Sequence, residues 1–245
     1  MREKVKKITL LSEREKVKKE EKERCILTTY EKIRQNEAVK IYIQRADESL
    51  AALGFTEHSF AHVTKAAESV KYILQTLGFS EHQVEMGMIA AYLHDIGNLI
   101  NRSEHAQSGA IMAFRILDEM GMPAEDVATI VTAIGNHDEG TGIPVNAIAA
   151  ALILADKSDV RRSRVRNRDE QTFDIHDRVN YSVEKADLTI DQEEKQIRLN
   201  LTVDTRYGSV MDYFEIFLGR MIMCRKAADK LGLQFKLIIN DQSLI

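Results

Sequence analysis

The chain has 245 residues, of which 44% are hydrophobic and 29% are charged, and its formal net charge is -4. A chain of this length can bury a substantial core, as one large domain or as one domain with an appendage. The acidic balance argues against a globally basic nucleic-acid-binding protein. No apolar run reaches the roughly 18 residues that a bilayer-spanning helix needs, and the N-terminus is too charged for a secretory signal, so we expect a cytoplasmic protein without membrane contact.

The first 53 residues form a charged N-terminal segment of helical composition. Residues 1–24 alternate Lys and Arg with Glu around a thin apolar stripe, which predicts a solvated helix or a frayed end. A coiled-coil arm or a nucleic-acid contact is the alternative for this stretch. Residues 25–53 carry more apolar positions, and they predict one or two helices that pack on the next domain.

Two helices are predicted between residues 54 and 95. Thr56 is the expected cap of the first, which carries apolar residues at three-and-four spacing and ends at Gly78. Ser80 followed by Gln83 has the pattern of a capping box, and it predicts the start of the second helix. This second helix ends in an apolar run directly before His94 and Asp95.

Three more helices follow in the same domain. His105 opens the first, which ends at Gly121, and Pro123 suits the first turn of the second. A glycine-rich loop, residues 139–144, leads into residues 147–155, which are almost wholly apolar and end in Asp156. A helix that is apolar all round belongs in the centre of a core.

The composition changes after residue 160, and we expect a separate unit over residues 166–245. An arginine cluster comes first, and two alternating stretches around residues 191–195 then predict a β-hairpin with one buried face. A helix from Ser209 to Leu231 and a strand from Phe235 to Ile239 complete a ββαβ pattern. The apolar face of the hairpin needs a cover, which the helix from Ser209 or a second subunit in a homodimer can supply.

The histidines of residues 54–165 fall at helix boundaries. Because helices joined by short loops pack antiparallel, their ends meet, and His62, His94 and His137 can converge although they are distant in sequence. An imidazole beside a carboxylate, as in His94-Asp95, can ligate one metal ion. The pair alone is weak support, since a buried histidine with a satisfied hydrogen bond is more common.

The order of these residues resembles the HD superfamily of metal-dependent phosphohydrolases. The pattern of that family, His, His-Asp and Asp, is matched by His62, His94-Asp95-Ile96-Gly97 and Asp156, and the resemblance covers residues 54 to about 160. It implies a mainly α fold, in which an HD-domain helical bundle over residues 54–165 is followed by the small α+β (ββαβ) unit. It also implies that His62, His94, Asp95 and Asp156 ligate a divalent metal ion.

A partial similarity to the HD-GYP phosphodiesterases concerns the following loop. His105 stands where two-metal members carry an extra histidine, and Asn136-His137-Asp138 with residues 140–144 is similar to a shortened His-His-Glu and Gly-Tyr-Pro segment. The chain departs from those patterns at Asn136, at Ile143 and at Asn98, where a lysine often follows the His-Asp-Ile-Gly motif. The shortened loop argues against a cyclic dinucleotide as substrate.

The resemblance and the chemistry of the residues together suggest a two-metal site. Asp95 would bridge the ions, with His105 and His137 as ligands of the second, and a water between two cations is a good nucleophile at neutral pH. Asp138 would orient His137 or accept a proton. Lys157 or Arg161 would contact the substrate phosphate. These ligand types accept Mn, Fe, Zn, Ni or Mg, and the sequence does not distinguish them.

Three functions are consistent with this pattern. The first is hydrolysis of a phosphate ester of a nucleotide or another small phosphorylated molecule through a metal-activated water. The second is a non-catalytic regulatory protein that binds a metal and a nucleotide, and the third is a di-iron oxygenase on the same fold. RNA binding by the arginine cluster is disfavoured, because no aromatic residues interleave with it.

Overall fold

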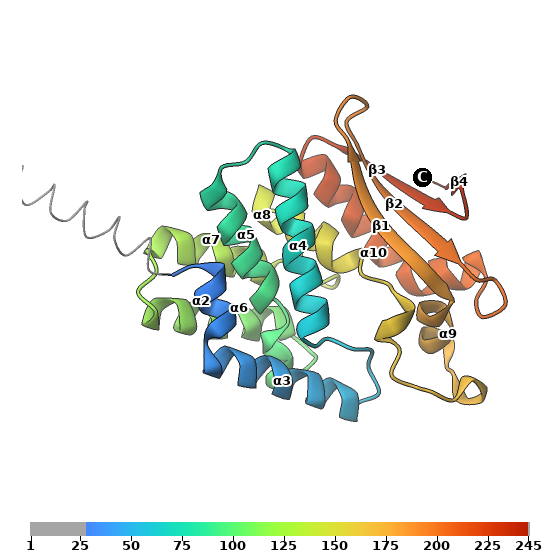
Figure 1. Cartoon of the computed structure of the whole chain (residues 1–245), viewed down its shortest axis with the longest axis horizontal. Coiled ribbons are helices and arrows are strands. Elements are labelled where there is room, and N and C mark those ends of the chain that lie inside the picture. Colours follow the sequence, from blue (N-terminus) through green and yellow to red (C-terminus); the bar gives the residue numbers. More distant parts are fainter. Residues whose placement is uncertain (1–27, 245) are drawn as a thin grey trace, which may run out of the picture.

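The structure is a computed structural model that describes residues 28–244 (Figure 1). The predictions made for residues 1–24 lie outside the described residues. Thr28 donates a hydrogen bond from its hydroxyl to the carbonyl of Met120, 3.0 Å away, so the described chain begins against the helical body.

Seven helices form that helical body within the described range. They are α2 (Tyr30–Gln35), α3 (Glu37–Ala52), α4 (Phe60–Thr76), α5 (Glu81–Leu93), α6 (His105–Glu119), α7 (Ala124–Gly135) and α8 (Ala147–Lys157). The helices expected from the apolar spacing are all present. As expected for residues 25–53, α2 packs on α5, and α3 packs on a 3-10 turn that follows α5. No helix between residues 28 and 244 has both the length and the apolarity needed to cross a membrane.

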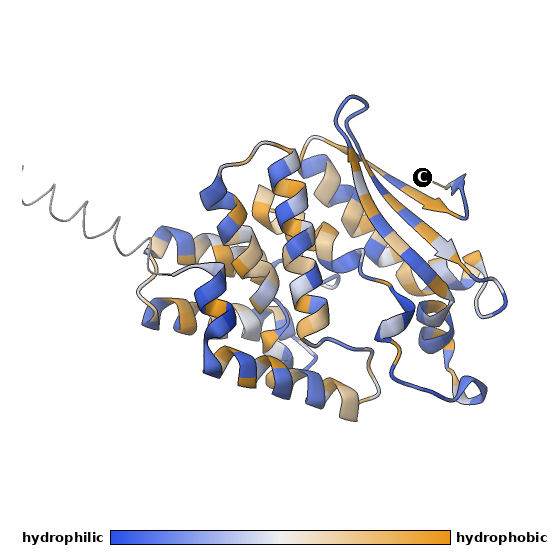
Figure 2. Cartoon of the chain, viewed as in Figure 1, coloured by the Kyte–Doolittle hydropathy of each residue, from blue (hydrophilic) through white to orange (hydrophobic). Residues whose placement is uncertain are grey.

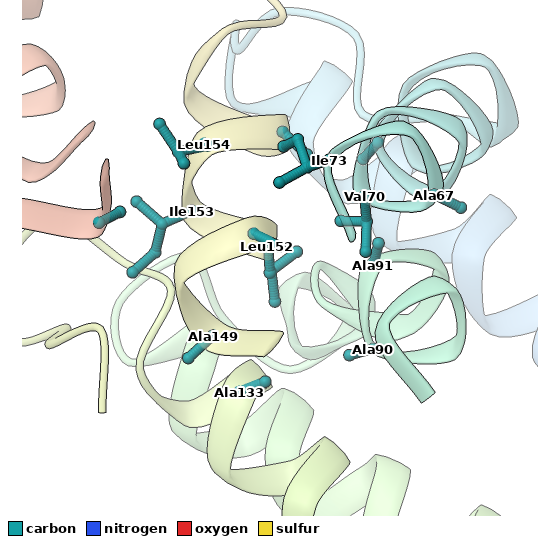
Figure 3. Packing of buried hydrophobic residues seen from close by; sticks show 14 of the residues in the cluster. Ala67, Val70, Ile73, Ala90, Ala91, Ala133, Ala149, Leu152, Ile153 and Leu154 are labelled. Carbon is teal, nitrogen blue, oxygen red and sulfur yellow. The ribbon is translucent and has the colours of Figure 1, made fainter. Parts of the chain in front are cut away.

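The central helix of the body is α8, as its apolar sequence predicts. Every residue from Ile148 to Lys157 is buried, and the helix contacts α4, α5, α7 and α10 (Val210–Lys230). Figure 3 shows Leu152 facing Val70 of α4 and Ala91 of α5. Burying a leucine side chain contributes about 1.5 to 3 kcal/mol, so this packing fixes where the end of α8, with Asp156, lies.

Of the two predicted helix N-caps, one is present in the structure and one is not. At α5 the capping box of Ser80 and Gln83 is confirmed. The predicted cap of α4 is wrong, because the N-cap is Ser59 and not Thr56. Tertiary contacts hold the residues between them outside the helix: the Glu57 amide donates to the carbonyl of Arg164, and the His58 amide donates to a carboxylate oxygen of Asp47, both at 2.8 Å.

The C-terminal unit contains a mixed four-stranded sheet. Its elements are α9 (Ile175–Ser182), β1 (Val183–Asp191), β2 (Gln196–Val203), α10 (Val210–Lys230), β3 (Gln234–Ile239) and β4 (Gln242–Ser243). The strand order is β1-β2-β3-β4, with β2 and β3 parallel and the other pairs antiparallel. The predicted fold class, mainly α with a small α+β unit at the C-terminus, is confirmed. Helix α9, whose residues are mostly polar, and the short β4 were not predicted from the sequence.

Helix α10 provides the cover that the hairpin needs. Residues Ile197, Leu199 and Leu201 are buried at alternate positions of β2, and α10 packs on β3 and on α8. Figure 2 shows apolar residues alternating with polar ones along the strands that face α10. Helix α10 therefore lies between the sheet and α8 of the helical body.

Candidate metal centre

The six predicted metal ligands converge at one place in the helical body. His62 lies in the first turn of α4, His94 and Asp95 directly follow α5, His105 opens α6, and His137 and Asp156 lie at the ends of α7 and α8. All six are buried: His62, His94, Asp95, His105, His137 and Asp156. The antiparallel packing predicted from the short connections therefore brings the helix ends together.

One group of donor atoms surrounds His62. Its Nε2 lies 3.3 Å from Nε2 of His94 and 3.3 Å from Oδ1 of Asp156. Oδ2 of Asp95 lies 3.3 Å from Nε2 of His94 and 3.6 Å from Nε2 of His62. The donor atoms of His62, His94 and Asp156 are all within 4.8 Å of one another, so they could hold one metal ion.

A second group lies on the other side of Asp95. Its Oδ1 is 3.5 Å from Nε2 of His105 and 4.0 Å from Nε2 of His137, and these two nitrogens are 3.2 Å apart. Oδ1 of Asp138 is 3.9 Å from Nε2 of His105. The two oxygens of Asp95 thus face different histidine pairs.

All four histidines present Nε2 to the cluster because Nδ1 is engaged elsewhere. The Nδ1 partners are Oδ2 of Asp159 for His62 at 2.8 Å, and the carbonyls of Ala91 for His94 at 2.7 Å, Arg102 for His105 at 3.1 Å and Ile134 for His137 at 2.6 Å. A carbonyl oxygen can only accept, so Nδ1 carries the proton and a neutral ring leaves Nε2 as a lone pair.

The donor set fits a metal ion on this geometry. Two neutral rings would bring Nε2 lone pairs face to face at 3.3 Å in His62 and His94, and at 3.2 Å in His105 and His137. Oδ2 of Asp95 is buried, and it accepts no hydrogen bond from residues 28–244. Arg102 Nη1 lies 3.4 Å from Nε2 of His105, but Oδ2 of Asp95 has no such donor, and a cation between the facing acceptors would supply the positive charge that they need.

The pKa values show the same demand for positive charge. Burial opposes protonation of His94, but the carboxylates of Asp95 and Asp156, 3.3 and 3.7 Å from Nε2, outweigh it and raise the pKa of His94 to about 10. Burial likewise opposes ionisation of Asp95, yet the charge of His94 holds the pKa of Asp95 well below its ordinary value. Burial and the charge of His94 lower the pKa of His137 to about 3. The carboxylates of the cluster are therefore ionised, and a metal ion would compete with protons for the imidazoles.

The turn after Asp95 positions that carboxylate. A 3-10 turn, Ile96–Leu99, follows it, and the side-chain amide of Asn98 donates to both the carbonyl and Oδ1 of Asp95 at 2.9 Å. Asn98 therefore orients the carboxylate of Asp95. This role depends on the bend of the turn, which the sequence pattern alone does not reveal.

Asp159 is a residue of the site that the sequence analysis missed. Its carboxylate accepts the Nδ1 proton of His62, and it is 1% exposed. The available signal was its position three residues after Asp156, where the end of α8 can present both carboxylates on one side. A carboxylate behind a ligating histidine fixes the ring and makes it a better ligand.

Replacing Asp159 by asparagine should weaken metal binding about 10- to 100-fold, the usual effect of removing such a partner. Titration of the purified variant with Mn²⁺ measures the affinity, and the variant Asp229→Asn, on the exposed side of α10, is the matched control. An unchanged affinity in a folded Asp159→Asn protein would show that Asp159 does not support His62.

The two predicted phosphate contacts lie in different places. Nζ of Lys157 is buried beside the centre, 2.7 Å from Oδ2 of Asp156 and 3.3 Å from Oε1 of Glu139. The guanidinium of Arg161 binds Asp159, so it lies on the Nδ1 side of His62, behind the ring. Asp138, predicted to orient His137 or accept a proton, contacts His105, while the carbonyl of Ile134 orients His137.

A cavity of about 260 Å³ opens beside the second group. Arg102, His105 and Asp138 line it, together with residues of the 139–144 loop. Arg102 was also missed by the sequence analysis, because a single arginine in a loop carries no signal. Its Nη1 donates to Oδ1 of Asn98 at 3.3 Å, which places a cation next to the Asp95 turn.

The arginine cluster after α8 is mostly structural. Arg164 is buried and donates to the carbonyls of Glu57 and Asp159, and Arg166 pairs with Asp47. These arginines tie the segment after α8 to the start of α4 and to α3. Because most of these arginines are paired, they do not form a solvated basic face.

No family model matches the chain, but it is similar to known proteins. An uncharacterized protein of Methanocaldococcus jannaschii is 24% identical over 203 residues, covering 73% of this chain and 77% of its own length. A crystal structure described as a predicted HD superfamily hydrolase, from an uncultured Thermotogales bacterium, matches with a TM-score of 0.40 and 24% identity. That match covers 51% of this chain and 67% of the other.

Proposed function

We propose that the chain is a divalent-metal-dependent hydrolase of a phosphate ester, carried by a nucleotide or another small phosphorylated molecule. One observation carries the proposal: Asp95 directs Oδ2 toward His62 and His94, and Oδ1 toward His105 and His137. A carboxylate shared by two groups of imidazole donors suits a pair of cations about 3.5 to 4 Å apart.

The residues that would hold the ions follow from the two groups. The first ion would bind His62, His94, Asp95 and Asp156, and the second would bind Asp95, His105 and His137. When bound, the ions supply a water with a lowered pKa and neutralise phosphoryl oxygens as charge develops. The nitrogen and oxygen donors accept Mn, Fe, Zn or Ni, so the metal must be measured.

Asp138 is our candidate for the proton acceptor. It lines the cavity of about 260 Å³ beside the second group, which we call the entrance cavity, and its Oδ1 is 3.9 Å from Nε2 of His105. Burial disfavours its charged form, but Lys157 and His105 lower the pKa of Asp138 below its ordinary value. An ionised carboxylate at the entrance can take a proton from the attacking water at Oδ1.

Arg102 is our candidate for the phosphate contact at the entrance. It lines the same cavity as His105 and Asp138, whereas Arg161 lies behind His62. A guanidinium matches phosphate oxygens in a two-pronged geometry. Lys157 would add positive charge beside Asp156.

Replacing Arg102 by glutamine should lower kcat/KM for a phosphate ester about 10- to 100-fold, because a hydrogen bond to a charged group contributes about 1.5 to 3 kcal/mol. Steady-state kinetics at saturating metal measures the change. The control is Arg45→Gln on the exposed face of α3, which should leave the kinetics unchanged. Equal kinetics for the two variants would remove Arg102 from the proposed site.

The proposal is tested by metal analysis of the purified protein, followed by assays with Mn²⁺ on nucleotides, phosphomonoesters and phosphodiesters. We expect release of phosphate or of the esterified alcohol, and loss of this activity in His94→Ala. Absence of release at any metal loading would contradict the hydrolase. Bound iron with oxygen consumption would instead support an oxygenase, and metal with nucleotide binding but no turnover would support a regulatory protein.

Replacing His105 by alanine should lower the metal content from two ions toward one per chain, because His105 belongs only to the second group of donors. Metal analysis by mass spectrometry measures the ratio. His82→Ala is a suitable control, since His82 is exposed and pairs with Asp126 away from the centre. An unchanged ratio in His105→Ala would contradict a two-metal site.

A further inference from the structure

A second cavity, of about 630 Å³, lies between α4, the segment after α8, α9 and β1. It has no lining residue in common with the entrance cavity. In Figure 1 the segment that leaves α8 runs past α4 toward α9. We call this space the basic pocket, because its lining includes five basic side chains: Lys65, Arg161, Arg162, Arg168 and Lys185.

The basic pocket has more basic than acidic side chains in its lining, and it has an aromatic wall. Lys185 pairs with Asp187. Three acidic side chains, fewer than the basic ones, also line it: Glu170, Glu184 and Asp187. Within residues 28–244, Arg168 is exposed and has no ion-pair partner. Phe173 and Tyr181 form an apolar side of the pocket, and their rings pack edge to face with centroids 5.0 Å apart. This lining suits an anion that carries an organic part.

Arg162 is held rigidly at the wall of the pocket and is incompletely paired. Its guanidinium lies 4.5 Å from the centre of the Tyr181 ring, and its Nε donates to the Tyr181 carbonyl. Nη2 is buried and forms no hydrogen bond with residues 28–244; Glu184 and Asp204 approach it only to 3.6 and 3.8 Å. A preorganised guanidinium with a donor that forms no hydrogen bond is a favourable element of an anion site.

The basic pocket is connected to the metal centre through Asp159. Oδ2 of Asp159 accepts the Nδ1 proton of His62, while Oδ1 contacts Nζ of Lys65 at 3.1 Å and Nε of Arg161 at 2.8 Å. Lys65 and Arg161 line the pocket. The pocket therefore lies on the Nδ1 side of His62, and the metal ligands lie on the Nε2 side, so a molecule in the pocket is not at the reacting position.

We propose that the basic pocket binds a phosphorylated small molecule with at least two negative charges, at a site separate from the metal centre. Its phosphate oxygens would bind Arg162 and Arg168. They would compete with Asp187 for Lys185, and with Asp159 for Lys65 and Arg161. This competition changes the hydrogen bond between Asp159 and His62. Binding of an anion in the pocket would therefore affect His62, a proposed ligand of the first metal ion, because Asp159 contacts both the pocket and His62.

Pyrophosphate is the probe, and the protein is the full chain stripped of metal and then desalted. Calorimetric titration at low salt should show that one pyrophosphate binds per chain. Because the protein has been stripped of metal, this binding cannot be mediated by a metal ion. The double variant Arg168→Gln/Lys185→Gln should weaken binding at least about tenfold. Arg115→Gln, on the exposed face of α6, should leave it unchanged. No binding to the wild type, or equal binding to the double variant, would overturn the site.

The variant Asp159→Asn tests the connection between the basic pocket and His62, because it should strengthen the binding of pyrophosphate. It removes the competing carboxylate from Lys65 and Arg161, so a folded variant should bind pyrophosphate severalfold more tightly than the wild type. Proton NMR of the wild type gives a second readout, since the Nδ1 proton of His62 should shift as pyrophosphate saturates the pocket. An unmoved resonance with unchanged affinity in Asp159→Asn would overturn the linkage. Because these readouts need no metal and no turnover, they stand apart from the hydrolase assays.

Discussion

Replacing Asp95 by asparagine is expected to lower phosphate-ester hydrolysis about a thousandfold or more, and to reduce bound metal below one ion per chain. The amide presents a single weak oxygen donor, whereas the carboxylate directs one oxygen to each histidine pair. The variant therefore loses charge at both positions at once. Removing one preorganised charge-stabilising group already costs about 10²- to 10³-fold in rate.

Thermal unfolding provides an independent readout for the same variant. Metal at a hundredfold excess over its dissociation constant should stabilise the wild type by about 2.7 kcal/mol, and the variant much less. Without metal, Asp95→Asn should unfold at a lower temperature, because it leaves the buried His94 without the carboxylate that stabilises its charged form. The exposed Asp118→Asn in α6 is the matched control. Two ions per chain in Asp95→Asn would contradict a bridging role.

Replacing Gly97 by alanine should destabilise the fold by about 3 kcal/mol and separate Asp95 from His105. A Cβ at Gly97 would lie 2.0 Å from the carbonyl oxygen of His105 and 2.5 Å from the amide nitrogen of Gly109. Both are backbone atoms of α6, so the 3-10 turn and the helix would have to move apart. Overpacking of this kind typically costs about 1 to 3 kcal/mol.

Gly219→Ala is the control for this effect. Gly219 lies within α10, and a Cβ there meets no atom within 4 Å, so alanine should stabilise the helix by about 0.5 to 1 kcal/mol. Urea unfolding measures both variants, and metal analysis shows whether Gly97→Ala has lost the second position. If Gly97→Ala keeps the stability and metal content of the wild type, the 3-10 turn and α6 can move apart without loss, and the prediction is wrong.

The elements of this chain were predictable where local patterns dominate. Ser80 and Gln83 cap α5 through contacts within four residues, and alternating residues around 191–195 gave the β1–β2 hairpin. The predicted cap at Thr56 failed because distant groups, the Arg164 carbonyl and the Asp47 carboxylate, hold residues 57 and 58 outside α4. Long-range hydrogen bonds of this kind leave no periodic signal.

The sequence by itself determined which side chains stand at the ends of the helices, because apolar spacing and helix stops place His62, His94, Asp95, His105, His137 and Asp156 there. Only the tertiary structure decided how they meet. It sets the two oxygens of Asp95 against different histidine pairs, and it brings Asp159 behind His62 and Arg102 beside the entrance. The physical reason is that helix ends are set by local propensity, whereas ring orientation and second contacts depend on how α8 packs among its neighbours.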